Sequence, residues 1–210
     1  MSERAARRAE AGPDVVAVDT NGEALTRNQL ARRERVIKSA MALAAEGGYD
    51  AVQMRDVAAQ ANVALGTIYR YFSSKDHLLA ATLVEFSRDL QTRVERRAPR
   101  GSLPADRVVD VVRRAMAAIE RQPRLGKAMV SAISSPDPAV SECQAEMSAI
   151  MVELLSEPMG DVDPARRLRI VSVLSHVWFS SLLGWVNDWA NVGDVGDELE
   201  SAARLLLPGA

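Results

Sequence analysis

The chain has 210 residues, of which 48% are hydrophobic and 4% aromatic, and a formal net charge of −2. Plentiful Ala, Val and Leu with few aromatic residues favour helices, so we expect an all-α fold with one core or two modest ones. Cys143 is the only cysteine, which excludes an intrachain disulfide and gives no sign of an oxidising compartment. The expected location is cytoplasmic.

The first 26 residues mix Arg, Ala, Gly, Pro and Asp without helical periodicity, and they lack the sustained apolar run of a signal peptide. We therefore expect residues 1–26 to be disordered. From Arg27 onward, apolar residues recur at helical spacing, and Gly47-Gly48 predicts the end of this first helix. The arginines near its start could reach DNA phosphates or a minor groove, or they could simply be solvated.

A short helix and a tight turn are predicted next. Apolar residues at positions i, i+3, i+4 and i+7 place one apolar stripe on the helix: Met54, Val57, Ala58 and Ala61. Asparagine tolerates a left-handed backbone, so Asn62-Val63 can form the turn between two crossing helices. The pattern is typical of a helix-turn-helix.

The second helix, expected over Leu65–Phe72, carries groups that suit DNA. Ile68 and Phe72 can pack inward, which leaves four side chains facing outward: Thr67, Tyr69, Arg70 and Tyr71. A threonine methyl can contact a thymine methyl, and phenolic or guanidinium donors can reach phosphates or guanine edges. Gly66 would allow a close backbone approach. Lys75, just after Ser74, could hold a phosphate at a helix N-terminus, or Ser74 could be only a cap and Lys75 only solvated.

Residues 36–79 resemble the TetR family of bacterial transcriptional repressors, through a helix, R-D-V-A, a turn, G-T-I-Y, Phe72, Ser74-Lys75 and Leu78. The resemblance implies a helix-turn-helix domain at residues 27–75, and a bridging helix with a ligand-binding and dimerisation domain at 76–210. It implies double-stranded operator DNA and a second copy of the chain as partners. Eight positions match those that the family uses on DNA: Arg55, Leu65, Gly66, Thr67, Tyr69, Arg70, Tyr71 and Lys75.

Three residues depart from the family pattern. Gln53 and Ala64 stand where a capping Thr and a capping Ser are usual, and Asn62 stands where Gly is usual. We expect the first two departures to weaken helix capping by about 1 kcal/mol each. None of the three removes a side chain that reads bases.

Charge is distributed unevenly along the chain. Residues 27–75 hold eight Lys or Arg against four Asp or Glu, whereas residues 98–210 hold eleven against fifteen. A basic module followed by an acidic one suits a small DNA-binding protein, because basic side chains release counterions from phosphates. A statistical fluctuation would give the same asymmetry.

Beyond the helix-turn-helix, helical periodicity continues to the end of the chain. A long helix from Ser74 to Arg97 should bridge the two modules as a rigid rod. Pro and Gly residues then divide the chain into five helical segments: Ala105–Gln122, Arg124–Ser134, Pro138–Glu157, Pro164–Asn191 and Val195–Leu207. Asp137 and Asp163 are the expected N-caps of the third and fourth.

The apolar stretch Ile170–Val186 is interrupted by serines, and it is rather short for an unassisted membrane span of about 20 residues. We expect a buried or interfacial helix here and no membrane partner. With Val195–Leu207, this helix should build a four-helix dimer seam, in which Ser180, Ser181 and Gly184 allow close approach.

Flexible apolar side chains in the second module are candidates for a small apolar ligand. Methionine is common where a pocket adapts to a large apolar molecule. The candidate ligand-binding residues are Met116, Met129, Met147, Met151, Trp178, Phe179 and Leu182. A plain core explains the same pattern. For the aromatic residues Trp178 and Phe179, a dimer seam explains it as well.

Several segments are similar to a TetR subgroup, the actinobacterial repressors of ketosteroid catabolism; they include RQPRLGKAM at Arg121–Met129 and LSHVWFSSLLGWVNDW at Leu174–Trp189. That resemblance implies control of sterol and cholesterol breakdown genes and release from DNA by a steroid acyl-CoA thioester. The phosphates of the thioester need cations. One cluster of basic side chains could supply them, or it could be an ordinary solvated helix face: Arg113, Arg114, Arg121, Arg124 and Lys127.

An enzyme is not expected, because no nucleophile, phosphate-loop, dinucleotide or metal motif occurs. His77 and His176 are interpreted as structural, and we expect no cofactor or metal. The alternatives that remain are a TetR-type regulator of another pathway, and a ligand-independent or activating dimer whose second module serves dimerisation only. A tightly packed second module without a cavity would favour the ligand-independent dimer, whereas a large apolar cavity entered by a basic mouth would favour release by an acyl-CoA thioester.

Overall fold

The computed structural model describes residues 24–207, and within this range the chain is helical and contains no strand. The prediction of an all-α fold is confirmed. The elements are α2 (Arg27–Ala51), α3 (Met54–Ala61), α4 (Leu65–Tyr71), α5 (Lys75–Arg96), α6 (Pro104–Glu120), α7 (Pro123–Ile133), α8 (Val140–Ser156), the 3-10 turn η1 (Glu157–Met159), α9 (Pro164–Val186) and α10 (Val192–Leu206).

The start of α2 is defined by a capping box. The Thr26 hydroxyl accepts a hydrogen bond from the Gln29 backbone N–H, and the Gln29 side chain accepts one from the Thr26 N–H at 2.7 Å. Leu25 is buried, so order begins before residue 27. The rest of the segment expected to be disordered, residues 1–23, lies outside the described residues.

A glycine interrupts α2 where the sequence predicts its end. Gly48 has φ 73° and ψ −160°, which breaks the helical path before the last residues assigned to α2. L-residues rarely adopt such a φ, so glycine is the residue type that fits this position. The predicted stop at Gly47-Gly48 is confirmed.

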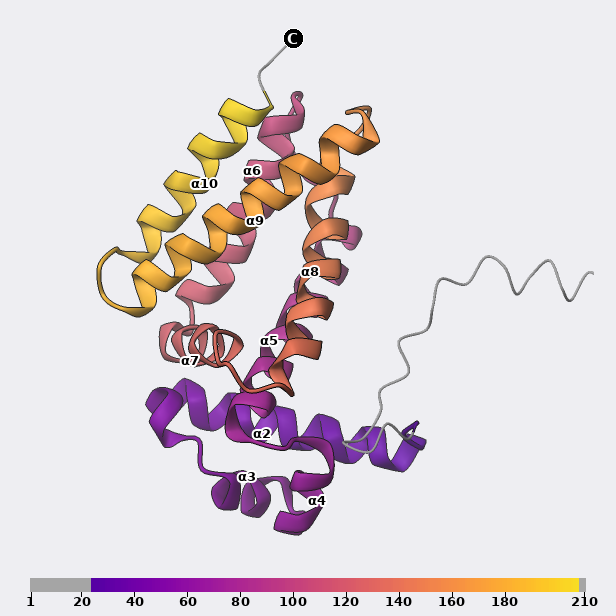
Figure 1. Ribbon diagram of the computed structural model, residues 1–210, viewed down its shortest axis with the longest axis vertical. Helices are drawn as coiled ribbons and strands as arrows, with labels where there is room; N and C mark the ends of the chain where they lie inside the picture. Colours follow the sequence, from indigo (N-terminus) through magenta and orange to yellow (C-terminus); the bar gives the residue numbers. More distant parts are fainter. Residues whose placement is uncertain (1–23, 208–210) are drawn as a thin grey trace, which may run out of the picture.

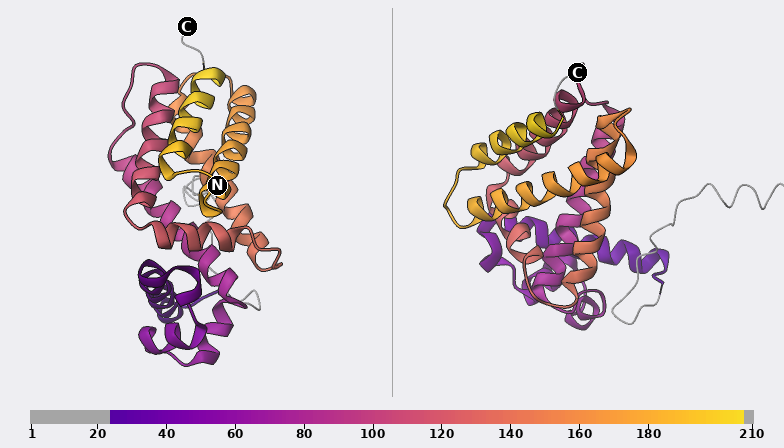
Figure 2. Two further views of the ribbon diagram at one scale, coloured as in Figure 1. Left: turned by 90° about the vertical axis from the view of Figure 1, so that its left-hand side faces the viewer. Right: turned by 45° about the horizontal axis from the view of Figure 1, so that its top comes forward.

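The molecule has a small end and a larger helical body. Helices α2, α3 and α4 lie together at one end, and α5 runs from them into the body formed by α6 to α10 (Figures 1 and 2). In the body α10 packs against α6 and α9, and α7 packs against both α2 and α5. The C-terminal end of α10 lies at the opposite end of the molecule from α3 and α4 (Figure 1).

Buried side chains form two cores, and α7 belongs to the same core as the small end. The first core joins α2, α3, α4 and the first half of α5 to α7 and part of α8. The second core joins the end of α5 to α6, α9 and α10. Packing against α7 therefore fixes the small end to the body.

Two predicted N-caps have different outcomes. Asp163 caps α9, since its carboxylate accepts from the Arg166 N–H at 2.9 Å, as predicted. Asp137 does not cap α8, because that helix begins at Val140. The Asp137 carboxylate instead accepts hydrogen bonds from the Ala139 N–H (3.0 Å) and the Ser74 hydroxyl (2.5 Å), and these bonds lower its pKa.

Helix α9 is longer than its apolar stretch, because it begins at Pro164. By length and composition it could cross a membrane, contrary to the expectation drawn from residues 170–186 alone. Its buried apolar residues pack in the second core: Ile170, Val171, Leu174, Trp178 and Trp185. A core helix passes the same test of length and composition.

Candidate DNA interface and effector cavity

Helices α3 and α4 cross through the turn predicted at Asn62. Asn62 adopts a left-handed conformation, with φ 52° and ψ 54°, and its N–H reaches the carbonyls of Ala58 and Ala59. Neither Gln53 nor Ala64 makes a side-chain cap, as expected from their departure from the TetR pattern. Packing holds the two helices, since Val57, Ile68 and Phe72 are completely buried.

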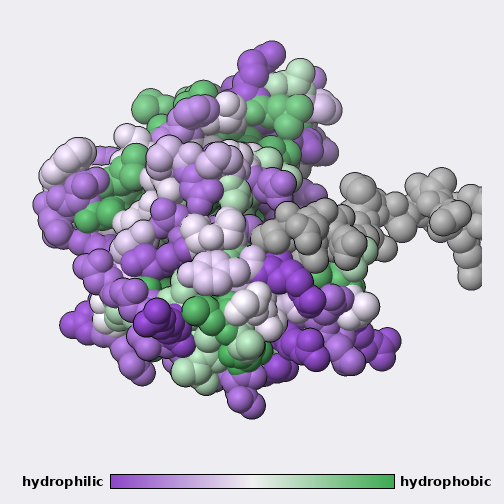
Figure 3. Space-filling view, turned by 60° about the horizontal axis from the view of Figure 1, so that its bottom comes forward, coloured by the Kyte–Doolittle hydropathy of each residue, from purple (hydrophilic) through white to green (hydrophobic). Residues whose placement is uncertain are grey.

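The outer surface of this end carries several of the predicted DNA contacts. Arg55, Gly66 and Arg70 are exposed, and Tyr69 is 47% exposed. Thr67 is half-buried. Figure 3, with this end turned forward, shows mostly hydrophilic side chains around a hydrophobic patch. The arrangement can place a methyl, a phenol and guanidinium groups against a DNA groove.

Two of the predicted contacts, Leu65 and Tyr71, pack inward. Leu65 is half-buried against the first core. Tyr71 is only 3% exposed, so the expectation that it faces outward is wrong. It lies three residues after Ile68 and beside Phe72, on the inward side of α4, and this i+3 relation identifies the face. Its hydroxyl oxygen accepts a hydrogen bond from Arg70 at 3.2 Å.

Lys75 is held against the body of the protein. Its Nζ lies 3.8 Å from the centroid of the Tyr49 ring and donates to the Tyr49 carbonyl at 3.3 Å. The Tyr49 hydroxyl in turn donates to Asp76 at 2.5 Å. Burial, followed by the contact with Asp76, raises the pKa of Tyr49 to about 12. An ammonium has three donors, so Lys75 can still offer one to a phosphate.

Polar contacts also connect this end to the α7–α8 loop. Asp76 accepts a second hydrogen bond from the Ser135 hydroxyl at 2.7 Å, next to the bond between Ser74 and Asp137. Arg124 of α7 donates to the Glu46 carbonyl of α2 at 2.6 Å. A displacement of α7 would therefore be transmitted to α2 and to the start of α5.

A cavity of about 520 Å³ lies between α5, α7, α8 and α9, with contributions from α6. This volume is within the range of about 300–1,000 Å³ typical of small-molecule sites. Six of the seven candidate ligand-binding residues line the cavity: Met129, Met147, Met151, Trp178, Phe179 and Leu182. Met116 does not line it, because it is buried in the second core facing Gly196 of α10.

Helix α5 contributes a wall that the sequence analysis did not assign to a ligand. Leu83, Phe86, Ser87 and Leu90 line the cavity from one face of α5. Leu83, Phe86 and Leu90 recur at the helical spacing from which the bridging helix is predicted. Periodicity identifies such a face, but it does not distinguish a face that lines a cavity from one in a closed core.

Both parts of the chain match TetR-family sequences. Residues 36–82 match the family described as "Bacterial regulatory proteins, tetR family", and residues 101–206 match "Tetracyclin repressor-like, C-terminal domain". The chain belongs to the TetR family. It is 38% identical over 194 residues to "HTH-type transcriptional repressor KstR" of Mycobacterium tuberculosis, covering 91% of this chain and 88% of that protein. It is thus a TetR-type transcriptional repressor similar to KstR, a DNA-binding regulator and not an enzyme.

Solved TetR structures share this fold. A TetR transcriptional regulator from Rhodococcus sp. RHA1 is 28% identical, with a TM-score of 0.78, and the match covers 87% of this chain and 99% of that chain. FadR of Thermus thermophilus, a TetR family repressor solved in complex with lauroyl-CoA, is 25% identical with a TM-score of 0.65. That match covers 83% of this chain and 92% of FadR.

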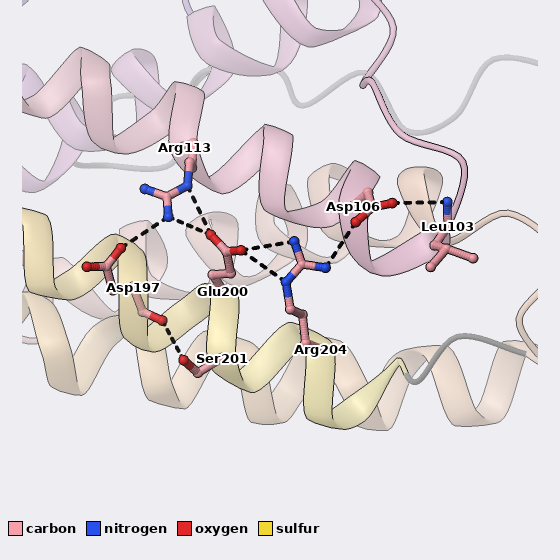
Figure 4. Close-up of polar contacts among 7 residues, drawn as sticks. All are labelled: Leu103, Asp106, Arg113, Asp197, Glu200, Ser201 and Arg204. Carbon is pink, nitrogen blue, oxygen red and sulfur yellow. Dashed lines mark hydrogen bonds and ion pairs between the residues drawn. The ribbon is translucent and has the colours of Figure 1, made fainter.

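The basic cluster of this TetR-type repressor does not lie at the cavity. None of the five cations is among the described residues that line it, and four have other contacts. Arg113 pairs with Asp197 and Glu200 of α10 (Figure 4). The other three contacts are those of Arg114 with Asp110, Arg124 with the Glu46 carbonyl, and Lys127 with Asp188. Of the two interpretations of this cluster, a basic mouth and an ordinary solvated face, the structure therefore does not support the basic mouth.

Glu200 joins the network that ties α10 to α6, and we predict a modest stabilising role. Hydrogen bonds from Arg113 and then Arg204 lower its pKa from the ordinary value of 4.5. Glu200→Gln should lower the free energy of unfolding by less than about 1 kcal/mol at neutral pH and low salt, as is usual for exposed ion pairs. Urea denaturation measures this change.

The pH dependence of this effect follows from the lowered pKa of Glu200. A carboxylate with a lowered pKa in the folded state stabilises the protein above its unfolded pKa, and the stabilisation is lost as the pH falls through the folded value. The difference between wild type and Glu200→Gln should therefore disappear on acidification below about pH 4.5. Glu120→Gln, at an exposed position, is the control. An undiminished difference at pH 3 would contradict the ion-pair explanation.

The titratable groups of the TetR-type repressor have structural surroundings. Burial raises the pKa of the Cys143 thiol to about 11, so it is protonated at neutral pH and a poor nucleophile. Burial lowers the pKa of His77, whose ring packs edge-on against Phe72 at 5.5 Å. Its Nδ1 accepts from the Ser73 N–H at 3.2 Å, which fits the structural interpretation of this histidine.

Proposed function

We propose that this repressor binds a palindromic operator in the cytoplasm as a homodimer, controls sterol and cholesterol catabolism genes, and is released by a steroid acyl-CoA thioester. The observation that carries the proposal is the apolar cavity, which is lined by α5 and α7. Both helices pack against α2 in the DNA-binding end. A ligand in the cavity is therefore in contact with the two elements that position the reading helix.

The DNA part of the proposal rests on the exposed face of α3 and α4. We assign DNA contacts to Arg55, Gly66, Thr67, Tyr69 and Arg70, with Lys75 as a phosphate contact beside the Tyr49 ring. One seven-residue helix reads few bases, so two copies on a palindrome are needed for specificity. Two-fold pairing would place the reading helices about 34–36 Å apart, one turn of DNA.

The dimer part rests on α9 and α10. Large apolar side chains are exposed on these two helices: Val173 and Leu205, which do not line the cavity, and Leu168, which does. Ser180 is exposed and Gly184 is partly exposed, as close helix approach requires. Ser181 cannot serve this purpose, because it is buried and its hydroxyl donates to Val177 and Glu198. A second copy covering this face would bury the apolar residues.

The effector part rests on the cavity and on the relatives. KstR is named as a transcriptional repressor, and FadR is described with lauroyl-CoA bound. An apolar cavity of about 520 Å³ suits an acyl chain or a sterol body. The basic cluster does not line the cavity. Binding of the coenzyme A moiety must therefore be tested separately from binding of the apolar body.

The proposal is tested by titrating the protein with a steroid carboxylic acid, its CoA thioester and lauroyl-CoA, each with and without operator DNA. Fluorescence of Trp178, which lines the cavity, reports binding, and sedimentation gives the stoichiometry on DNA. We expect two copies per operator and tightest binding of the steroid thioester. Operator should weaken thioester binding by the factor by which thioester weakens operator binding, since coupling is reciprocal.

Each alternative has its own outcome. Tighter binding of lauroyl-CoA than of both steroids would favour a TetR-type regulator of another pathway. No binding of any of the three compounds would favour a ligand-independent dimer. Equal thioester affinity with and without DNA would exclude release by this ligand, and a single copy on the operator would exclude the dimer.

A further inference from the structure

Four charged side chains form a network of ion pairs, the Glu85 network, that joins three helices. Glu85 of α5 accepts from Arg33 of α2 at 3.2 Å, and the same carboxylate oxygen accepts from Arg88 of α5 at 3.1 Å. Arg88 also pairs through Nη2 with Glu146 of α8. The four side chains are 20–37% exposed, so water screens these pairs less than it screens fully exposed ones.

The Glu85 network reaches the DNA-binding end through Arg33. The guanidinium of Arg33 lies 5.3 Å from the ring centroid of Phe72, which is completely buried at the end of α4. A cation over an aromatic ring is attracted by the electrons of its face. Arg33 therefore contacts Glu85 and also the residue that anchors the reading helix. Loss of the pair with Glu85 would free the Arg33 side chain to leave Phe72.

The other end of the network lies in the wall of the cavity. Met147, next to Glu146, lines the cavity, and so does Phe86, next to Glu85. Helices α5 and α8 pack against each other, and Arg88 spans their contact. A change in the separation of α5 and α8 would therefore make or break the pair between Arg88 and Glu146.

Glu85 is shared by two cations, which makes its pairing sensitive to Glu146. With Glu146 in place, two carboxylates balance two guanidinium groups. Without that charge, both guanidinium groups would compete for one carboxylate, and they would repel each other. Arg88 could then turn both of its terminal nitrogens toward Glu85, and such bidentate pairing is the stronger arrangement. Arg33 would lose its partner.

We infer that Glu146 of α8 positions the reading helix α4 through the Glu85 network, and so strengthens operator binding from outside the DNA-binding end. The inference rests on the DNA contacts of α4 in the proposed function, but not on the identity of the effector. A movement of α8 away from α5 would act like removal of the Glu146 charge. The network thus gives the body of the protein a route by which it lowers operator affinity.

The test is a gel-shift titration of Glu146→Gln on a DNA fragment that the wild-type protein has selected from a random-sequence pool. We expect affinity to fall about fivefold, as one partly buried ion pair allows. Loss of an acidic charge alone would raise affinity for DNA, because it reduces repulsion of the phosphates. The expected direction is therefore opposite to that of a general charge effect.

Glu142→Gln is the matched control. It removes the same charge from α8 at an exposed position, and Glu142 has no ion pair among the residues that the structure describes. This variant should bind the fragment at least as tightly as wild type. Urea denaturation of both variants serves as the folding control.

A double-mutant cycle separates the network from a local change in α8. Glu85→Gln should itself lower affinity for the fragment, because Arg33 loses its charged partner. In that background Glu146→Gln should have no further effect. Unchanged affinity in Glu146→Gln, an equal loss in Glu142→Gln, or full additivity of the Glu85 and Glu146 substitutions overturns the inference.

A steroid CoA thioester distinguishes failure of this inference from failure of the proposed function. If the thioester leaves the operator affinity of wild type unchanged, the proposed release fails, and the inference stands on a loss in Glu146→Gln that requires Glu85. If the thioester releases wild type but Glu146→Gln binds normally, the proposed function stands and the inference is overturned. Failure of wild type to select any DNA overturns both.

Discussion

Replacing Gly66 by leucine is expected to abolish operator binding while the protein stays folded. Gly66 is exposed in α4, and no described heavy atom lies within 4 Å of a Cβ built there. Glycine costs a helix up to about 1 kcal/mol relative to alanine, so a larger residue should not destabilise α4. On DNA, however, a leucine side chain would hold the backbone away from the groove and disrupt neighbouring contacts. We expect affinity to fall at least about 100-fold.

Gel-shift titration with circular dichroism as the folding control measures this effect. Gly193→Leu is the matched control, because a Cβ there also meets nothing within 4 Å, but Gly193 lies in α10 at a distance from α4. It should bind operator like wild type. Normal binding by Gly66→Leu would mean that this face of α4 does not approach DNA.

Replacing Phe72 by alanine should have the largest effect on stability. Phe72 is completely buried where α4 ends. Its ring packs edge-on against Tyr71 and His77, and the Arg33 guanidinium lies 5.3 Å from the ring centroid. Removing a buried phenylalanine side chain typically costs about 3–5 kcal/mol. The DNA-binding end should therefore unfold at much lower urea concentration, and operator binding should be lost with it.

Phe179→Ala provides a control of the same chemistry. Phe179 is 43% exposed, so its replacement should cost far less stability. It lines the cavity, and the proposed function therefore predicts weaker effector binding with nearly unchanged unfolding. Similar urea midpoints for the two variants would show that Phe72 is not part of the core that holds α4.

Several features could be predicted because they depend on residues close in sequence. The left-handed turn at Asn62, the break at Gly48 and the cap at Asp163 all follow from local backbone preferences. The inward orientation of Tyr71 is local too, and the i+3 spacing from Ile68 would have indicated it. The i+4 pair of Ile68 and Phe72 alone does not define the whole inward face of α4.

Other features could not be predicted, because they depend on contacts between distant segments. Met116 and Met129 have the same side chain and both lie on apolar helical faces, yet one is in a closed core and the other lines the cavity. Asp137 looked like a helix cap and instead accepts from Ser74, 63 residues away. Arg113 looked available to a phosphate but is paired with Glu200, 87 residues away.

The sequence by itself determined the helices, the helix-turn-helix and membership of the TetR family, because periodicity, capping residues and a continuous motif are properties of neighbouring residues. Only the tertiary structure decided which apolar faces enclose a cavity, which charges are already paired, and that Glu85 joins Arg33 of α2 to Arg88 of α5. Helical spacing shows which side of a helix is apolar. It does not show which other helix covers that side, and that packing decides between core, cavity and dimer surface.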